Sequence, residues 1–119
     1  ELTQAEFEAF QAKGKNLYQA KCVACHQPNG QGLPGAFPPL AKSDYLAKAT
    51  IKRFTQQVYL GSAGLGSKGL VVNGVKYSPA MAAMSQDSKE ITALANYVLN
   101  TWGNSFGPVK ESQVKEYMK

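Results

Sequence analysis

Histidine and cysteine are scarce in this chain of 119 residues, which holds one histidine and two cysteines. A structural zinc site needs a fourth ligand, for which the sequence offers no convincing residue. No apolar run approaches the roughly 18 to 20 residues of a membrane span, and the first residues lack the basic-then-apolar order of a signal peptide. These absences predict a small soluble domain whose limited core a built-in cofactor would help to fill.

Acidic residues are nearly missing from the middle of the chain. Between residues 9 and 86, nine lysine or arginine side chains accompany a single acid, Asp44, and the net charge of the whole chain is +5. The lysines are scattered singly without a nucleic-acid-binding signature, so we expect no nucleic-acid partner. The basic residues form either an ordinary solvated surface or a face that steers an acidic partner.

Local patterns predict a mostly helical chain. Thr3 and Glu6 have the spacing of a capping box, which starts a helix that runs into residues 22–26. Gly14 lies inside that helix at a cost of roughly 1 kcal/mol relative to alanine, and a close crossing with another helix would explain it.

The rest of the chain is expected to form one domain with that helix, spanning residues 1–119, with its core in about 3–103 and a C-terminal extension over 104–119. The expected elements are a short helix over 43–49, a helix that Thr50 caps and Gly61 ends, a glycine-rich loop over 61–69, a hairpin over 70–77, a helix from Asp87 to Gly103, and a short surface helix in the tail around Val114 and Tyr117.

Both cysteines and the only histidine fall in one segment, Cys22-Val23-Ala24-Cys25-His26. A thioredoxin-like Cys-x-x-Cys pair opens a helix in a βαβ arrangement, whereas this motif closes a helix in a mostly helical chain. Covalent haem attachment uses all three side chains, because the thiolates add to the two vinyl groups and the adjacent imidazole binds iron. The segment therefore predicts a c-type haem.

A second iron ligand is expected downstream, where methionine is the remaining soft donor. The chain contains Met81, Met84 and Met118. Met118 lies next to the chain end, where core filling or surface exposure is expected. Met81 and Met84 lie in the same loop between the hairpin and the last main helix, and spacing alone does not choose between them.

Taken together, these motifs resemble a class I cytochrome c. The segments that match are KGKNLYQAKCVACH (13–26), GAFPPL (35–40), VNGVKYSPAM (72–81) and EITALANYVLNTWG (90–103). The similarity covers about residues 10–105 and is closest to bacterial cytochromes c552 and to haem c domains fused to copper nitrite reductases and quinoprotein dehydrogenases. It implies an all-α fold in which the N- and C-terminal helices cross, with short middle helices and a small β-hairpin around one covalent haem c.

The resemblance also implies roles for individual residues. Gly14 and Tyr18 correspond to positions that cross the last helix at Leu94 and Tyr97, and Arg53 is either a partner of a haem propionate or a surface residue. The expected haem contacts are Cys22 and Cys25 through thioethers, His26 and Met81 on iron with Met84 as the alternative, Pro38 through a carbonyl that accepts a hydrogen bond from the imidazole, and Leu40 packed on the haem.

A filled iron coordination sphere implies a one-electron carrier rather than an enzyme. The expected partners are redox proteins such as a terminal oxidase, a copper nitrite reductase or a cytochrome bc1-type donor. They would meet an exposed haem edge formed by small apolar side chains, namely Val23, Ala24, Ala80, Ala82 and Ala83.

The resemblance implies a periplasmic protein, because bacteria complete covalent haem attachment outside the cytoplasm, and we expect a monomer. Two alternatives stay open. In the first, the chain is the excised haem domain of a larger reductase or oxidase. In the second, it carries a peroxidase-like haem with a labile bond between methionine and iron.

Overall fold

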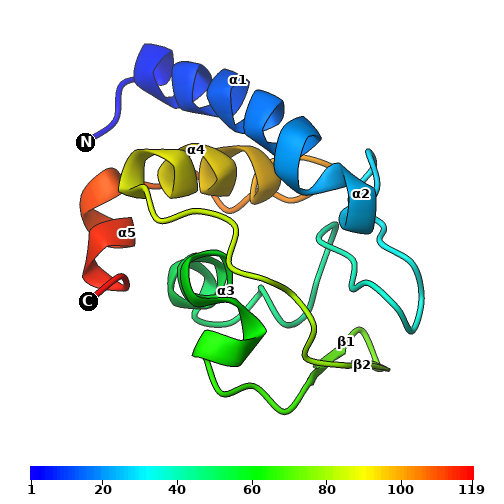
Figure 1. Cartoon of the computed structure of the whole chain (residues 1–119). Helices are drawn as coiled ribbons and strands as arrows, with labels where there is room; N and C mark the ends of the chain where they lie inside the picture. The colour runs from blue at the N-terminus through cyan, green and yellow to red at the C-terminus, as the bar shows by residue number, and fades with distance from the viewer.

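The computed structural model describes residues 1–119, most of whose regular structure is helical (Figure 1). The elements in chain order are α1 (Gln4–Lys21), α2 (Val23–His26), α3 (Thr50–Gly64), β1 (Leu70–Val72), β2 (Val75–Tyr77), α4 (Ser88–Val98) and α5 (Glu111–Glu116). None of the helices combines the length and the apolar character that a membrane crossing requires.

Helix α1 begins as predicted. The hydroxyl of Thr3 accepts a hydrogen bond from the Glu6 amide at 3.1 Å, and the Glu6 carboxylate accepts one from the Thr3 amide at 2.9 Å. At the other end, the Cys22 amide still donates to the Tyr18 carbonyl at 2.9 Å. Cys22 therefore ends α1 and begins α2, so the two helices meet without a spacer.

Helices α1 and α4 cross closely, as Figure 1 shows. A Cβ atom on Gly14 would overlap the Ala93 carbonyl and the Cβ of Tyr97. Next to this contact, the rings of Tyr18 and Tyr97 have centroids 5.7 Å apart. The predicted crossing is confirmed, with Ala93 rather than Leu94 directly beneath the glycine.

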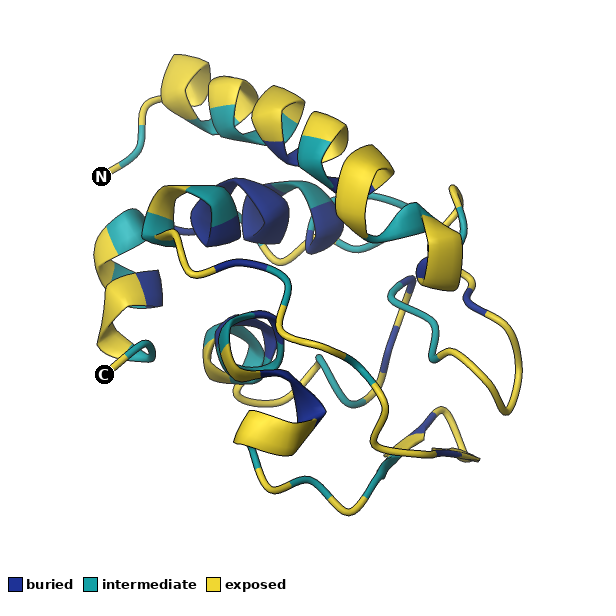
Figure 2. Cartoon of the chain, in the orientation of Figure 1, coloured by how far each residue is buried: buried dark blue, intermediate teal, exposed yellow.

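The core is centred on α4, which lies between α1 and α3 (Figure 2). Seven of the eleven residues of α4 are buried, whereas α1 buries only Gly14 and Tyr18. Helix α4 is therefore the centre of the fold, and α1 covers one side of it.

The short helix predicted over 43–49 is wrong. This segment forms turns, and Ala49, in the left-handed conformation with φ 46°, precedes the first helical residue, Thr50. Thr50 is thus not the cap. The reason is tertiary, since Arg53 reaches back from α3 to donate a hydrogen bond to the Tyr45 carbonyl at 2.7 Å. Because the Tyr45 carbonyl already accepts this hydrogen bond, it does not need a backbone amide of a helix as its partner.

Helix α3 is interrupted at the predicted residue. Gly61 has φ 68° and ψ 176°, which ends the regular helix, but the chain then makes one further turn to Gly64. The loop predicted over 61–69 therefore starts only after this turn. The kink redirects the end of α3 toward the loop that holds Met81, as described below.

The predicted hairpin is confirmed. Strands β1 and β2 are antiparallel, and the turn residues Asn73 and Gly74 both have positive φ, as a tight hairpin turn requires. Asn73 also exchanges two hydrogen bonds with Asp44, from the Asp44 amide to Oδ1 at 2.9 Å and from the Asn73 amide to the carboxylate at 2.7 Å. The hairpin tip is thereby attached to the 44–47 turns.

Helix α4 starts as predicted and ends early. Asp87 caps it by accepting hydrogen bonds from two backbone amides. The helix stops at Val98, and the chain continues in turns to Trp102 and Gly103, which adopt left-handed conformations with φ 56° and 87°. This turn packs the Trp102 ring against Tyr18 and lets its Nε1–H donate to the Pro28 carbonyl at 3.2 Å.

The C-terminal segment is more closely packed than expected. Helix α5 forms, but Val109 and Val114 are both 0% exposed and belong to the main hydrophobic cluster. The expectation of a helix on the surface is wrong for Val114, and the core extends beyond residue 103. The link is polar as well, because the buried Asn96 side chain bonds both backbone groups of Val109.

Candidate haem-binding site

The cysteines and the histidine lie on one helical turn. The amides of Cys25 and His26 both point back to the Cys22 carbonyl, at 3.3 and 2.9 Å. Side chains three and four residues apart on such a turn are neighbours. Neither cysteine forms a disulfide, and Cys22 is half-buried and Cys25 exposed, so both sulfurs are available for thioether bonds.

The imidazole of His26 is buried and oriented. Its Nδ1 lies 2.8 Å from the Pro38 carbonyl oxygen, the contact expected from the sequence. A carbonyl can only accept, so Nδ1 carries the hydrogen and Nε2 keeps a free lone pair. Burial lowers the pKa of His26, while the hydrogen bond to Pro38 acts in the opposite direction. The net effect favours the neutral imidazole, which is the form that binds a metal.

Gly32 makes the contact between His26 and Pro38 possible. Its φ is 65°, and a Cβ atom there would overlap the carbonyl groups of Phe37 and Pro38. Its amide also donates to the His26 carbonyl at 3.0 Å. Only a glycine at this position lets the chain pass between His26 and Pro38. The sequence shows that glycines are frequent in this loop, but this role was not predicted from it.

Leu40 follows Pro38 on the same loop. Its side chain is half-buried and packs against the main hydrophobic cluster. Its amide donates to the Gly30 carbonyl at 2.7 Å, which closes the loop that begins after His26. This hydrogen bond holds Leu40 in a fixed position relative to the segment that follows His26.

The loop between β2 and α4 contains Met81 and Met84 and is called the methionine loop below. Hydrogen bonds join it to the last turns of α3. The Met81 carbonyl accepts a hydrogen bond from the Ser62 amide at 2.8 Å, and the Met84 amide donates to the Val58 carbonyl at 2.8 Å. Both methionine side chains are half-buried against the main hydrophobic cluster. The loop thus runs back along α3, with both thioethers available near the core.

The residues around CVACH fit a covalently attached haem. Two unpaired thiols lie one turn apart, and a buried neutral imidazole keeps Nε2 free. No group of three or more His, Cys, Asp or Glu side chains is arranged to hold a bare metal ion. The two thiols would hold a haem through its vinyl groups, and His26 would offer Nε2 to its iron.

Arg53 has partners of its own. Its guanidinium carbon lies 4.3 Å from the centroid of the Tyr45 ring, and Nη1 donates to the Tyr45 carbonyl. This stacked arrangement explains why the side chain is only partly exposed. The contact with a haem propionate stays a prediction.

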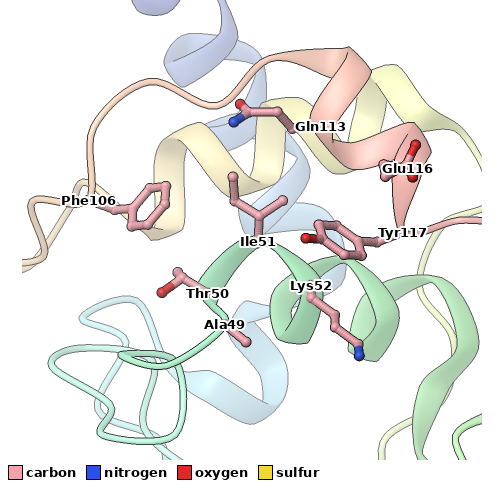
Figure 3. A pocket seen from close by; sticks show the side chains of 8 residues that line it. All are labelled: Ala49, Thr50, Ile51, Lys52, Phe106, Gln113, Glu116 and Tyr117. Atoms are coloured by element: carbon pink, nitrogen blue, oxygen red, sulfur yellow. The ribbon is translucent and has the colours of Figure 1, made fainter.

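A separate hollow of about 320 Å³ lies between the start of α3 and helix α5 (Figure 3). Ile51, Phe106 and Tyr117 contribute its apolar surface. No residue of CVACH or of the methionine loop lines it, so it is not part of the haem-binding site.

Comparison with known proteins identifies the class. Residues 11–102 match the Cytochrome c family, and the chain belongs to this family. Its helices and single hairpin are those of the class I cytochrome c fold, and the resemblance inferred from the sequence is confirmed. Family membership implies one covalently bound haem c and a role in electron transport.

The chain is similar to two Thermus thermophilus proteins named cytochrome c-552. Each is 38% identical over 115 residues and matches 89% of this chain, with 84% of one relative and 74% of the other covered. The cytochrome c subunit of a quinone alcohol dehydrogenase from Gluconacetobacter polyoxogenes is 25% identical over 96 residues, which cover 76% of this chain and 19% of that subunit.

Proposed function

We propose that this chain is a one-electron carrier, not an enzyme, whose haem iron is bound by His26 and Met81 on opposite faces. The observation that carries the proposal is the Nδ1 contact of His26 with the Pro38 carbonyl. It leaves Nε2 as the only free imidazole nitrogen, on the residue that follows the second cysteine. Such a hydrogen bond fixes the ring orientation of a metal-binding histidine and raises its basicity.

The choice of Met81 rests on spacing. Both methionines have anchored backbones and similar burial, but Tyr77 and Met81 have the Tyr-x-x-x-Met spacing of the family. We therefore take Met81 as the ligand and keep Met84 as the alternative. A neutral thioether favours ferrous over ferric iron and raises the reduction potential relative to a second histidine.

Haem c supplies the reversible one-electron change at iron. The protein holds the ligands in fixed positions, because His26 belongs to a helical turn continuous with α1 and its ring is bonded to Pro38. With both His26 and Met81 bound to iron, no position on the iron would stay open for a substrate. Little has to move when an electron arrives or leaves, which suits a carrier better than a catalyst.

The test is the optical spectrum of the oxidised, haem-loaded protein. We expect the sulfur-to-iron charge-transfer band in the wild type, its loss in Met81→Ala and its retention in Met84→Ala. The reverse pattern in the two variants would move the ligand to Met84. A high-spin wild-type spectrum without the band, together with rapid carbon monoxide binding to the reduced protein, would favour the peroxidase-like alternative.

We infer that the partners are redox proteins that approach the haem edge. Of the five predicted edge residues, Ala24, Ala80, Ala82 and Ala83 are exposed in the structure, whereas Val23 is half-buried. The four alanines offer a small apolar contact, as short-lived electron-transfer complexes use. The net charge of +5 suits an acidic partner, such as an acidic patch on a terminal oxidase or a copper nitrite reductase. A periplasmic location and a monomeric state belong to the same proposal.

The excised-domain alternative also has support. In the Gluconacetobacter polyoxogenes subunit, the similar region is only 19% of a longer chain. Domains of this kind therefore also occur as parts of larger redox subunits. The electron-carrying role proposed here is the same in either setting.

A further inference from the structure

The kink of α3 touches the methionine loop through backbone atoms. A Cβ atom on Gly61 would lie 2.6 Å from the Ala83 nitrogen and 2.9 Å from the Met81 carbonyl oxygen. These distances are shorter than real Cβ contacts, so only glycine allows this approach. Since φ at Gly61 is also positive, the residue both turns the helix and admits the loop.

Ser62, the next residue, bonds both backbone polar groups of Met81. The Ser62 amide donates to the Met81 carbonyl at 2.8 Å, and the Met81 amide donates to the Ser62 hydroxyl oxygen at 3.2 Å. Ser62 is only 6% exposed. The two bonds form a closed pair that fixes the Met81 backbone and leaves its thioether uninvolved.

Gln57 supports this pair from one turn earlier on α3. Its side-chain Nε2 donates to the Ser62 hydroxyl oxygen at 3.3 Å. Because the Met81 amide donates to the same oxygen, the Ser62 hydroxyl oxygen receives two hydrogen bonds.

We propose that Ser62 is a positioning residue for the iron–sulfur bond, and that Gln57 assists it. This inference rests on the proposed coordination of iron by His26 and Met81. Movement of the loop away from α3 would carry the thioether off the iron, and this movement would break the Met81 pair in a buried place. Ser62 thus lowers the population of states in which the sulfur has left the iron.

Imidazole titration of the oxidised haem-loaded protein tests this role, since imidazole competes with the methionine for iron. In Ser62→Ala we expect the apparent imidazole affinity to rise roughly five- to tenfold, the equivalent of about one net hydrogen bond. The charge-transfer band should weaken and the reduction potential should fall. Ser62→Thr keeps the hydroxyl and should restore the wild-type behaviour.

Ser43→Ala is the matched control. Ser43 is 8% exposed, and its hydroxyl also accepts one backbone amide bond, from Leu46 at 3.2 Å, in a segment without a proposed iron ligand. We expect its imidazole affinity to equal that of the wild type. A generic loss of stability would affect both serine variants alike, whereas a positioning role affects Ser62→Ala alone.

The outcomes separate this inference from the proposed function. A wild-type protein without the charge-transfer band would overturn the His26 and Met81 coordination itself. A wild type with the band, and Ser62→Ala indistinguishable from Ser43→Ala, would overturn only the role of Ser62. If Ser62→Ala fails to take up haem, Gln57→Leu decides: a smaller rise in imidazole affinity supports the positioning role, and an unchanged affinity refutes it.

Discussion

The buried side chain of Asn96 connects α4 to the C-terminal segment, and its removal should destabilise the whole protein. Asn96 is 0% exposed. Its Nδ2 donates to the Val109 carbonyl at 2.9 Å and to the Thr92 carbonyl at 3.0 Å, and its Oδ1 accepts from the Val109 amide at 2.7 Å. The substitution Asn96→Ala removes all three bonds at once.

The expected loss follows from what remains behind. Val109 is also 0% exposed, so its amide and carbonyl would lose their Asn96 partner where water does not reach them. An unsatisfied buried polar group costs about 1–3 kcal/mol. For the two groups together we expect Asn96→Ala to lower the free energy of unfolding by about 3–4 kcal/mol, a large share of the roughly 5–15 kcal/mol of a typical domain.

The assay is urea unfolding of the haem-loaded protein followed by far-ultraviolet circular dichroism. Asn29→Ala is the control, because Asn29 is exposed and bonds only the nearby Gln31 amide. We expect the control to change stability by less than about 0.5 kcal/mol. An Asn96→Ala variant as stable as Asn29→Ala would refute the view that the tail is part of the core.

Three further predictions concern packing, pH and salt. Gly14→Ala should destabilise the protein despite a gain of about 1 kcal/mol in helix propensity, because its Cβ would overlap the Ala93 carbonyl; unchanged urea stability would contradict the close crossing. Hydrogen bonds from Ser85 and Lys21 lower the pKa of Glu90 below its usual 4.5. Glu90 therefore stabilises the fold above about pH 4.5 and loses this effect as the pH falls through its folded-state pKa. Glu90→Gln should be less stable than the wild type at pH 7, with a deficit that shrinks as the pH falls toward 3, and an equal deficit at both pH values would count against it. Electron transfer to an acidic partner should slow as ionic strength rises, and a rate independent of salt would remove the steering role of the lysines.

Two of the helix starts were predictable because their signals are local. Thr3 with Glu6 and Asp87 satisfy backbone amides within three residues along the chain, whatever the rest of the fold does. The 43–49 segment failed for the opposite reason, because Arg53 from α3 takes up the Tyr45 carbonyl. The sequence predicts Val114 on the surface, because no residue near it in the chain shows that Val109 is hydrogen-bonded to α4.

The same distinction applies to the site. Cys22, Cys25 and His26 share one helical turn, so spacing alone predicted their chemistry, and the family pattern supplied the Pro38 contact. Ser62 carried no such signal. Its partner Met81 lies 19 residues away, and the pairing depends on a kink at Gly61 that sequence reasoning treated only as a helix end.

The parts of the site are joined by close backbone contacts at glycines. Gly32 lets the chain pass between His26 and Pro38, and Gly61 brings α3 against the Met81 loop. Backbone contacts this close leave little room for the segments of His26 and Met81 to shift independently, since any movement strains a main chain rather than a flexible side chain. A carrier needs this rigidity, because structural change on electron transfer adds to its barrier. Gly61→Ala should therefore weaken the charge-transfer band by displacing the methionine loop, and an intact band would show that the loop does not depend on this contact.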